Sequence, residues 1–197
     1  PETVGAITYI SKNFDSLKNN TIAGFNVTCV GDDRAYSYLK SRMGNTITDK
    51  IAKHVLENFV EKYIEYPFLA KGSDERQYCH PHLDLPLVSI MRSKYGTYPE
   101  YHNSTDNLDF VTPKGLFGAF KVLDKCIEAV ELNEVYSTAF PCEPKMIKRN
   151  LHPEGWFKRR TGGVSKKTWN SVRNMMNVIF YCDGDHDVID IANTLNI

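Results

Sequence analysis

The sequence predicts an α/β domain followed by a basic loop and a short helical tail. Over the first 134 residues, segments with apolar residues at helical spacing alternate with short β-prone runs. One of those runs, Leu85–Met91, is continuously apolar, as expected of a strand that is buried on both faces. The apolar and charged fractions are those of a globular protein, and 197 residues suffice for one core with a small appended domain.

The first three elements follow in chain order. A helix over residues 3–18 ends at Asn19–Asn20. The alternating run at 25–30 predicts a strand, which the turn at 31–33 closes. A second helix is predicted over 48–63, because four apolar residues fall on one stripe. They are Ile51, Val55, Phe59 and Tyr63.

The next elements complete the α/β domain. Residues 64–69 are predicted to be extended, and Leu85–Met91 forms the buried strand. Thr112 suits the N-cap of a helix and Pro113 its first position, so a helix is predicted from here to about Leu132.

We therefore divide the chain into an α/β domain at 1–134, a basic linker or loop at 135–165, and a helical tail at 166–197. The linker is rich in Pro, Gly and charged residues. Within the tail, helices are predicted over Trp169–Tyr181 and Val188–Leu195, separated by a break at Asp183–Gly184.

Charge and cysteine content limit the partners. The formal net charge is zero, so no global field favours nucleic acid or membrane. No apolar run reaches the about 18 residues of a membrane span, and we expect no membrane partner. The five cysteines are scattered and form no C-x-x-C pair, which predicts reduced, mostly buried thiols in a cytoplasmic protein.

Two groups of residues are candidates for chemistry on spacing alone. His80 and His82 could share a metal on a strand, but the proline between them fits a loop better. Asp74, Glu75 and Asp84 lie near these histidines. Carboxylates beside histidine suit a metal site or an acid–base pair, and a solvated loop also contains them, so both interpretations stay open.

His102 is the third candidate. It follows the buried strand and a short aromatic loop, and it precedes a helix. Ligands of α/β sheets gather at loops beyond the carboxyl ends of strands, so His102 lies where a site is expected.

Three blocks, taken together, resemble the C-terminal half of the zinc exopeptidases related to bacterial leucyl aminopeptidase and glutaminyl cyclase. Those proteins share Ser-Asp-His/Glu, an apolar Gly/Leu-x-Pro strand, and Tyr-His-Thr/Ser-x-x-Asp. Here the blocks are Ser73-Asp74-Glu75, Leu85-Pro86-Leu87 and Tyr101-His102-Asn103-Ser104-Thr105-Asp106.

Nearly the whole chain is similar to a bacterial subfamily of aminopeptidase-like proteins that carry a C-terminal winged helix and often occur with polysaccharide biosynthesis genes. PETVGAITYIS and CVGDDRAYSYLKSR resemble its blocks, and MMNVIFYCDGDHDVIDIA resembles its tail. The resemblance implies part of a mostly parallel mixed sheet flanked by helices. The tail would then be the start of a winged helix.

The same resemblance implies roles for three residues. His102 matches a zinc ligand, and Asp74 matches an active-site carboxylate or one that supports the site. Glu2 falls where these enzymes place the general base that activates zinc-bound water. Thr3 and Thr28 stand where two-metal relatives have further ligands, which favours a single zinc.

The family's other zinc ligands lie in an upstream half that this chain does not contain. A catalytic site takes three protein ligands, so we expect these 197 residues to be weakly active or inactive alone. The expected function of the intact protein is a zinc-dependent aminopeptidase-like hydrolase that acts on a small peptide or aminoacyl substrate.

Two alternatives remain. One is a peptidase-like module that has lost catalysis and binds a ligand or partner. The other is nucleic-acid or partner binding through the stretch from Lys145 to Lys167, which has eight Lys or Arg against one acid. Trp156 and Trp169 are interleaved there. The zero net charge favours a solvated basic linker over nucleic-acid contact.

Overall fold

The computed structural model describes residues 2–146 and 166–197 and divides the chain into two compact units, 1–131 and 132–197. Most of the basic stretch lies outside the described residues, including Trp156 and the Lys158–Arg160 cluster.

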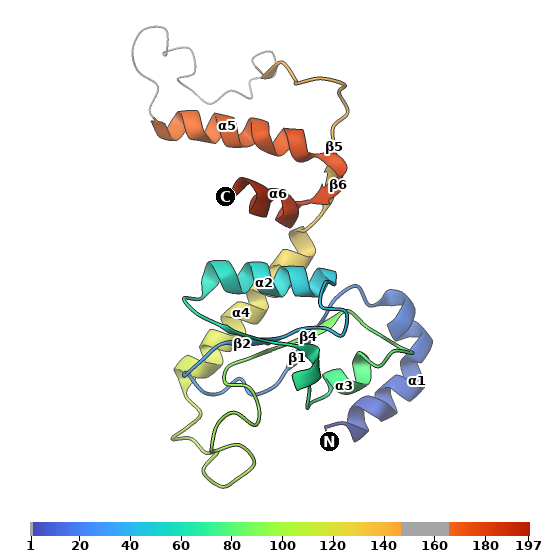
Figure 1. The fold of residues 1–197 in the computed structure, drawn as a ribbon, viewed down its shortest axis with the longest axis vertical. Helices are drawn as coiled ribbons and strands as arrows, with labels where there is room; N and C mark the ends of the chain where they lie inside the picture. The colour runs from blue at the N-terminus through green and yellow to red at the C-terminus, as the bar shows by residue number, and fades with distance from the viewer. Residues whose placement is uncertain (1, 147–165) are drawn as a thin grey trace. The chain divides into compact units, whose positions relative to one another are not determined.

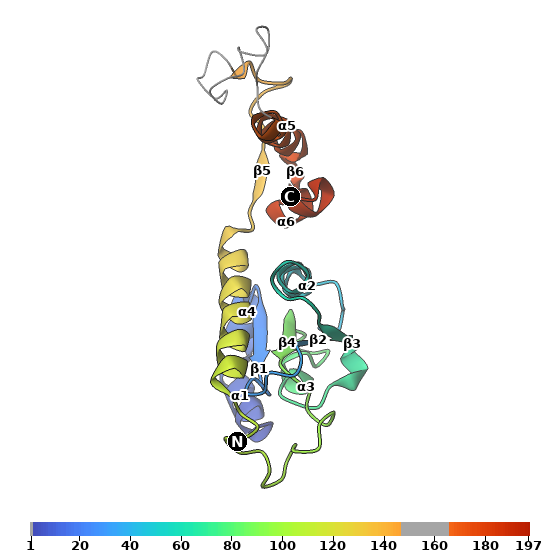
Figure 2. The same cartoon turned by 90° about the vertical axis from the view of Figure 1, so that its left-hand side faces the viewer.

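The first unit is built on a four-stranded mixed sheet in the order β1-β4-β2-β3 (Figures 1 and 2). β1 (Gly24–Val27) and β4 (Leu87–Met91) are parallel, β2 (Ser37–Leu39) is antiparallel to β4, and β3 (Ile64–Tyr66) is parallel to β2. All five residues of β4 are buried, because it has a strand on each side and helices over the sheet. The predicted α/β class with a mostly parallel mixed sheet is confirmed.

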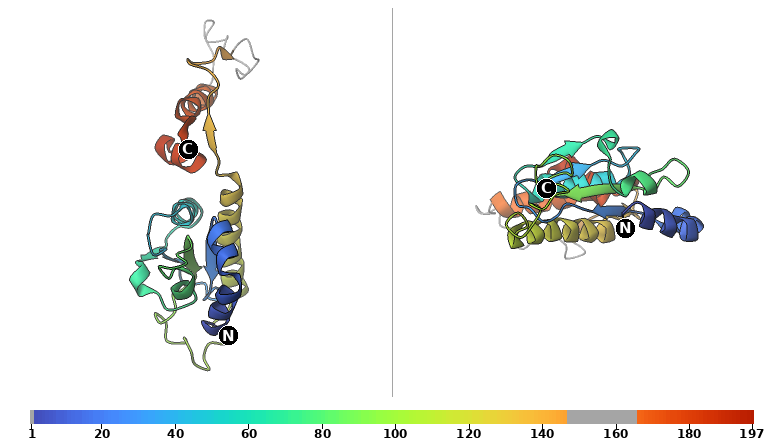
Figure 3. Two further views of the ribbon diagram at one scale, coloured as in Figure 1. Left: turned by 90° about the vertical axis from the view of Figure 1, so that its right-hand side faces the viewer. Right: turned by 90° about the horizontal axis from the view of Figure 1, so that it is seen from below.

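Helices cover both faces of this sheet (Figures 2 and 3). α1 (Val4–Asn20) and α4 (Pro113–Leu132) lie on one side, and α2 (Ile47–Phe59) lies on the other. Short helical turns, η1 (Phe68–Ala70) and α3 (Glu75–Tyr78), precede β4.

The helix starts follow local capping chemistry. The Thr112 hydroxyl accepts a hydrogen bond from Gly115 N at 2.9 Å, so the predicted N-cap is confirmed. Thr46 and Asp49 form a capping box at the start of α2. α2 buries Ile51 and Val55 of the predicted stripe, so that side of the helix faces the core.

The second predicted helix was too long at its end. α2 stops at Phe59, which is 57% exposed. Val60 is extended, and Ile64 N then donates to Tyr36 O at 2.9 Å, which draws the chain into β3. Pairing with β2 therefore ends the helix before Tyr63.

The second unit contains β5 (Val135–Ser137), α5 (Lys166–Tyr181), β6 (Asp183–Asp187) and α6 (Val188–Leu195). The two predicted tail helices are confirmed. The break expected at Asp183–Gly184 is instead strand β6, which pairs antiparallel with β5 inside the stretch predicted as loop. Asp187 and Asp190 form the capping box of α6.

Two further observations concern membranes and thiols. In the parts of the chain that the structure describes, no helix is long and apolar enough to cross a membrane. All five cysteines are free. Cys79 and Cys126 are buried, but Cys142 is exposed, so burial of the thiols is less complete than predicted.

Candidate functional site

A hollow of about 390 Å³ lies in the first unit, where the parallel strands β1 and β4 end. Its walls come from the segment after β1, the loop between β4 and α4, and the start of α4, together with Glu2. We call it the β1–β4 hollow. Sites of α/β proteins form at this edge of the sheet, and the volume is typical of small-molecule pockets. Its ionisable lining residues, tyrosines aside, are Glu2, Cys29, Asp32, His102 and Asp106.

Two of the three predicted site residues, Glu2 and His102, therefore line the same hollow. Both side chains are exposed. His102 lies in the long loop before α4, with its ring stacked on Tyr101 at a centroid distance of 3.9 Å.

Asp74 does not line the hollow, but its carboxylate binds the backbone of Thr3, the residue after Glu2. Its Oδ1 accepts a hydrogen bond from Thr3 N at 2.6 Å. Arg76 Nη2 donates to Thr3 Oγ1 at 2.7 Å, and Arg76 Nε donates to Ser73 O at 3.1 Å. Asp74 thus holds the backbone N–H of Thr3, the residue after Glu2, and Arg76 holds its hydroxyl.

Strained backbone gathers at the hollow. Among the described residues, five other than glycine have positive φ. Cys29 at 49° and His102 at 60° line the hollow, and Thr3 at 64° directly follows its lining residue Glu2. Such conformations cost free energy, especially for a β-branched residue such as Thr3, and they cluster at functional sites.

The two aspartates of the hollow differ in availability. Asp32 is 2% exposed, and its oxygens accept hydrogen bonds from Arg34 N at 3.0 Å, Ser93 N at 2.9 Å and Ser93 Oγ at 2.7 Å. It therefore anchors the segment after β1. Asp106 is exposed. With Glu2 and His102, it is an acid–base group that a ligand can reach.

Sequence reasoning gave no role to Cys29 or Asp32. Cys29 accepts a hydrogen bond from the Tyr98 hydroxyl at 3.4 Å. Cys29 falls near the end of the predicted strand at 25–30 and Asp32 falls in the turn after it, and this position was the available signal.

The other candidates lie apart from the β1–β4 hollow and do not line it. His80 and His82 are exposed in a turn, and the His82 carbonyl accepts from Lys18 Nζ at 2.9 Å, so the loop interpretation is confirmed. The carboxylates near them take separate partners. Asp84 pairs with Arg42 through two contacts of 2.7 and 2.5 Å.

Glu75 is fully buried and has a structural role. Its Oε1 accepts from Gly72 N at 2.7 Å, Ser73 N at 2.9 Å and the Tyr95 hydroxyl at 2.8 Å. Its Oε2 accepts from Asn26 Nδ2 at 2.9 Å and Ser89 Oγ at 3.3 Å. A buried carboxylate with this many donors is satisfied, and it fixes the turn that carries Asp74.

The described residues alone do not provide a zinc site. Within residues 2–146 and 166–197, no group of three or more His, Cys, Asp or Glu side chains could hold a metal ion. A catalytic zinc takes three protein ligands. His102 can supply one imidazole donor and no more.

Comparison with known proteins gives family matches for both units. Residues 1–133 match the model of the family described as a domain of unknown function, DUF4910. Residues 134–197 match the model of a winged helix-turn-helix family.

Individual relatives are similar over most of the chain. A protein of Clostridium acetobutylicum, named as a polysaccharide biosynthesis protein with an aminopeptidase-like domain, is 37% identical over 193 residues. This match covers 98% of the chain and 42% of that protein, so the chain spans less than half of the curated relative.

Two solved structures have similar folds. One, named as a peptidase from Clostridium acetobutylicum, gives a TM-score of 0.83 at 34% identity over 100% of this chain and 42% of that one. The aminopeptidase from Aneurinibacillus sp. strain AM-1 gives 0.54 at 16% identity over 64% of this chain and 30% of that one. The fold of the first unit is peptidase-like, and the second unit is of the winged helix class.

Proposed function

This chain belongs to the DUF4910 family, and from the names of its similar proteins we propose that it is part of an aminopeptidase-like hydrolase that cleaves amide bonds. The substrate is a small peptide or an aminoacyl compound, and the metal of the whole protein is zinc. His102 is one zinc ligand, and the others come from outside this chain. We place the protein in the cytoplasm because its five cysteines are free.

One observation carries this proposal, namely that Glu2 and His102 line the same hollow. The residue after Glu2 is held by Asp74 and Arg76, so the backbone that carries Glu2 is anchored at the hollow. A carboxylate and an imidazole that line one hollow suit general acid–base chemistry.

The steps that belong to this chain are proton transfers. Glu2 accepts a proton from water as the water oxygen attacks the amide carbonyl carbon. It then donates that proton to the amine as the C–N bond breaks. Asp74 acts through the backbone of Thr3 and does not touch the substrate. It is therefore a positioning residue in this scheme.

The test is the Glu2→Gln variant of the full-length protein, assayed with aminoacyl-nitroanilides. Loss of the general base lowers kcat by roughly a hundredfold to ten-thousandfold with the zinc content unchanged. Glu131→Gln, an exposed glutamate near the end of α4, is the matched control and keeps full activity. Equal turnover by Glu2→Gln and the wild type, at equal zinc content, contradicts the proposal.

Zinc stoichiometry tests the ligand assignment separately. We expect the isolated 197 residues to lose zinc during dialysis against a weak chelator, because His102 is one donor where three are needed. One tightly retained zinc per chain contradicts the assignment of the other ligands to the rest of the protein.

The second candidate is a binding module without catalysis. Thr3 and Thr28 stand where two-metal relatives have ligands, which favours it. This candidate predicts that the full-length protein hydrolyses no aminoacyl-nitroanilide with or without zinc.

Binding through the second unit is a further candidate, supported by its winged helix match. Strand β6 exposes Asp183 and Asp185, and carboxylates repel a phosphate backbone, so this strand favours docking to a protein over DNA. DNA binding with a steep salt dependence would reverse this preference.

A further inference from the structure

His102 lies in a long irregular segment. Residues 92–112, between β4 and α4, form no helix or strand. Loops of this length within a compact domain are usually functional, and they must be anchored if they carry a site residue. The anchor of this loop is visible in its contacts with the segment after β1.

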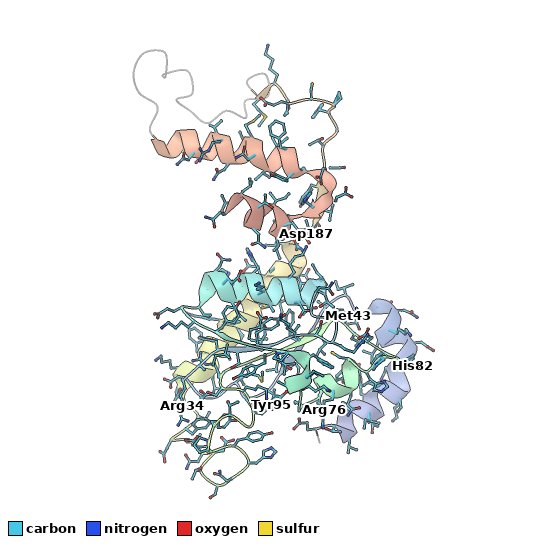
Figure 4. The ribbon with its side chains drawn as sticks, in the orientation of Figure 1. Arg34, Met43, Arg76, His82, Tyr95 and Asp187 are labelled. Carbon is cyan, nitrogen blue, oxygen red and sulfur yellow. The ribbon has the colours of Figure 1, made fainter. Side chains whose placement is uncertain are left out.

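One guanidinium holds the loop at two points. Arg34 Nη1 and Nη2 donate to Glu100 Oε2 and Oε1 at 3.0 and 2.7 Å, in a bidentate pair. The same guanidinium lies over the Phe110 ring, 4.6 Å from its centroid. Glu100 and Phe110 precede and follow His102, so Arg34 fastens both ends of the segment that carries it. Figure 4 labels Arg34 beside this loop.

Ring contacts continue from this anchor to His102. Phe110 stacks on Tyr98 at a centroid distance of 5.1 Å. Tyr98 meets Tyr101 edge to face at 5.7 Å, and Tyr101 stacks on His102 at 3.9 Å with 17° between the ring planes. These are favourable aromatic geometries.

All four rings line the hollow, and each of them also contacts another ring of the series. Phe110 has Arg34 and Tyr98 as neighbours, and Tyr98 has Phe110 and Tyr101. A platform for a substrate ring needs an unoccupied face, so these contacts favour an internal support. An imidazole supported in this way keeps one orientation, which ligation or acid–base chemistry requires.

We propose that Arg34 is a positioning residue for His102, acting through Glu100 and through the ring series Phe110, Tyr98 and Tyr101. The inference rests on the proposed function only for the role of His102 in hydrolysis. The support of the His102 ring by Arg34 is a property of the loop and does not depend on that role. Exposed ion pairs contribute little to global stability, and Arg34 is 51% exposed. Its loss should therefore appear at His102 and hardly in the unfolding midpoint.

The chain offers a matched control. Arg42 makes a bidentate pair with Asp84 at 2.7 and 2.5 Å and is 33% exposed. Its carboxylate partner Asp84 lies outside the loop at 92–112, and Arg42 does not line the β1–β4 hollow. Arg42→Ala therefore removes an equivalent ion pair without touching the ring series.

The experiment uses the full-length protein with ¹³C-labelled histidine and follows the His102 ring signal by NMR, assigned with His102→Gln. Arg34→Ala and Phe110→Leu should both move this signal, because the ring current of Tyr101 changes when the stack shifts. Arg42→Ala should leave it in place. Arg34→Lys should restore it only in part, since lysine lacks the bidentate fork.

Activity gives the second measurement. In Arg34→Ala, kcat/KM for an aminoacyl-nitroanilide should fall roughly tenfold to a hundredfold, as expected for a displaced site residue. In Arg42→Ala it should not change. The inference is overturned if the His102 signal of Arg34→Ala coincides with that of the wild type, or if Arg42→Ala moves it equally. If the signal moves while neither Arg34→Ala nor His102→Gln alters hydrolysis, the support stands and the role of His102 in the proposed hydrolysis is rejected.

Discussion

Asp49 shows how a single buried carboxylate organises its surroundings. It is 4% exposed, and it accepts hydrogen bonds from Ser41 N at 3.0 Å, Thr46 N at 2.9 Å and the Tyr38 hydroxyl. Burial alone raises the pKa of this carboxyl. The bonds from Ser41, Tyr38 and Thr46 outweigh burial and hold the pKa below its usual value.

This shift gives a prediction for Asp49→Asn. Because the folded-state pKa lies below the unfolded value of about 3.9, the carboxylate stabilises the fold above that pH. Its contribution is lost as the pH falls through the folded-state pKa. Asp49→Asn should cost about 1–3 kcal/mol at pH 7, and the difference from the wild type should shrink in acid. Urea unfolding of the wild type and of Asp49→Asn, at pH 7 and in acid, measures the difference in their free energies of unfolding. A difference that grows in acid contradicts the prediction.

Thiol reactivity is decided residue by residue. Burial raises the pKa of Cys79 to about 11 and that of Cys126 to about 12. Both thiols therefore stay protonated and unreactive near neutral pH. Cys142 is exposed.

We therefore expect iodoacetamide to alkylate Cys142 first in the native protein and to leave Cys79 and Cys126 unmodified at pH 8. Mass spectrometry of the digested protein gives the order. Labelling of Cys126 as fast as Cys142 contradicts the burial described here, and labelling of all five thiols in urea serves as the control.

At the scale of elements, the approach of α4 to the segment after β1 is unusually close. A Cβ on Gly115 would lie 2.1 Å from the Gly31 carbonyl oxygen and 2.4 Å from the Asp32 carbonyl oxygen. Only glycine allows this contact, which sets the start of α4 against the wall of the β1–β4 hollow.

Two Gly→Ala substitutions in helices should have opposite effects. Gly115→Ala should destabilise the protein by about 1–3 kcal/mol or more, because backbone atoms must move. Gly5→Ala in α1 has nothing within 4 Å of the new methyl group and should stabilise by up to about 1 kcal/mol. Chemical denaturation compares them, and equal effects of the two substitutions contradict the close contact.

At the scale of the whole molecule, each of the two units has a core of its own. Leu56 of α2 is 0% exposed in the first unit, and Ile191 of α6 is 4% exposed in the second. Units with separate cores often unfold separately, so two-state behaviour is not expected.

Calorimetry should therefore resolve more than one transition. Leu56→Ala should lower the midpoint of one transition, and Ile191→Ala should lower the midpoint of the other. Each buried truncation costs about 2–5 kcal/mol. A single transition that both substitutions shift equally contradicts independent unfolding.

Much of the secondary structure could be predicted from the sequence, because it depends on neighbours a few residues away. The apolar spacing of α1, the continuous apolar run of β4 and the Thr112 cap before α4 are such local signals. Strand β2, with three residues, is too short for any periodicity. This segment becomes a strand because it pairs with β4, and that pairing joins residues about fifty positions apart.

For the site, the sequence by itself determined the residue types, the likeness of their blocks to aminopeptidases, and the position of His102 after a buried strand. Only the tertiary structure decided that Glu2 and His102 share a hollow, that Asp74 binds the backbone of Thr3, and that Arg34 holds the loop of His102. The physical reason is distance along the chain. A helix or a cap is stabilised by adjacent residues, whereas contacts between residues tens of positions apart exist only after the sheet has brought their strands together.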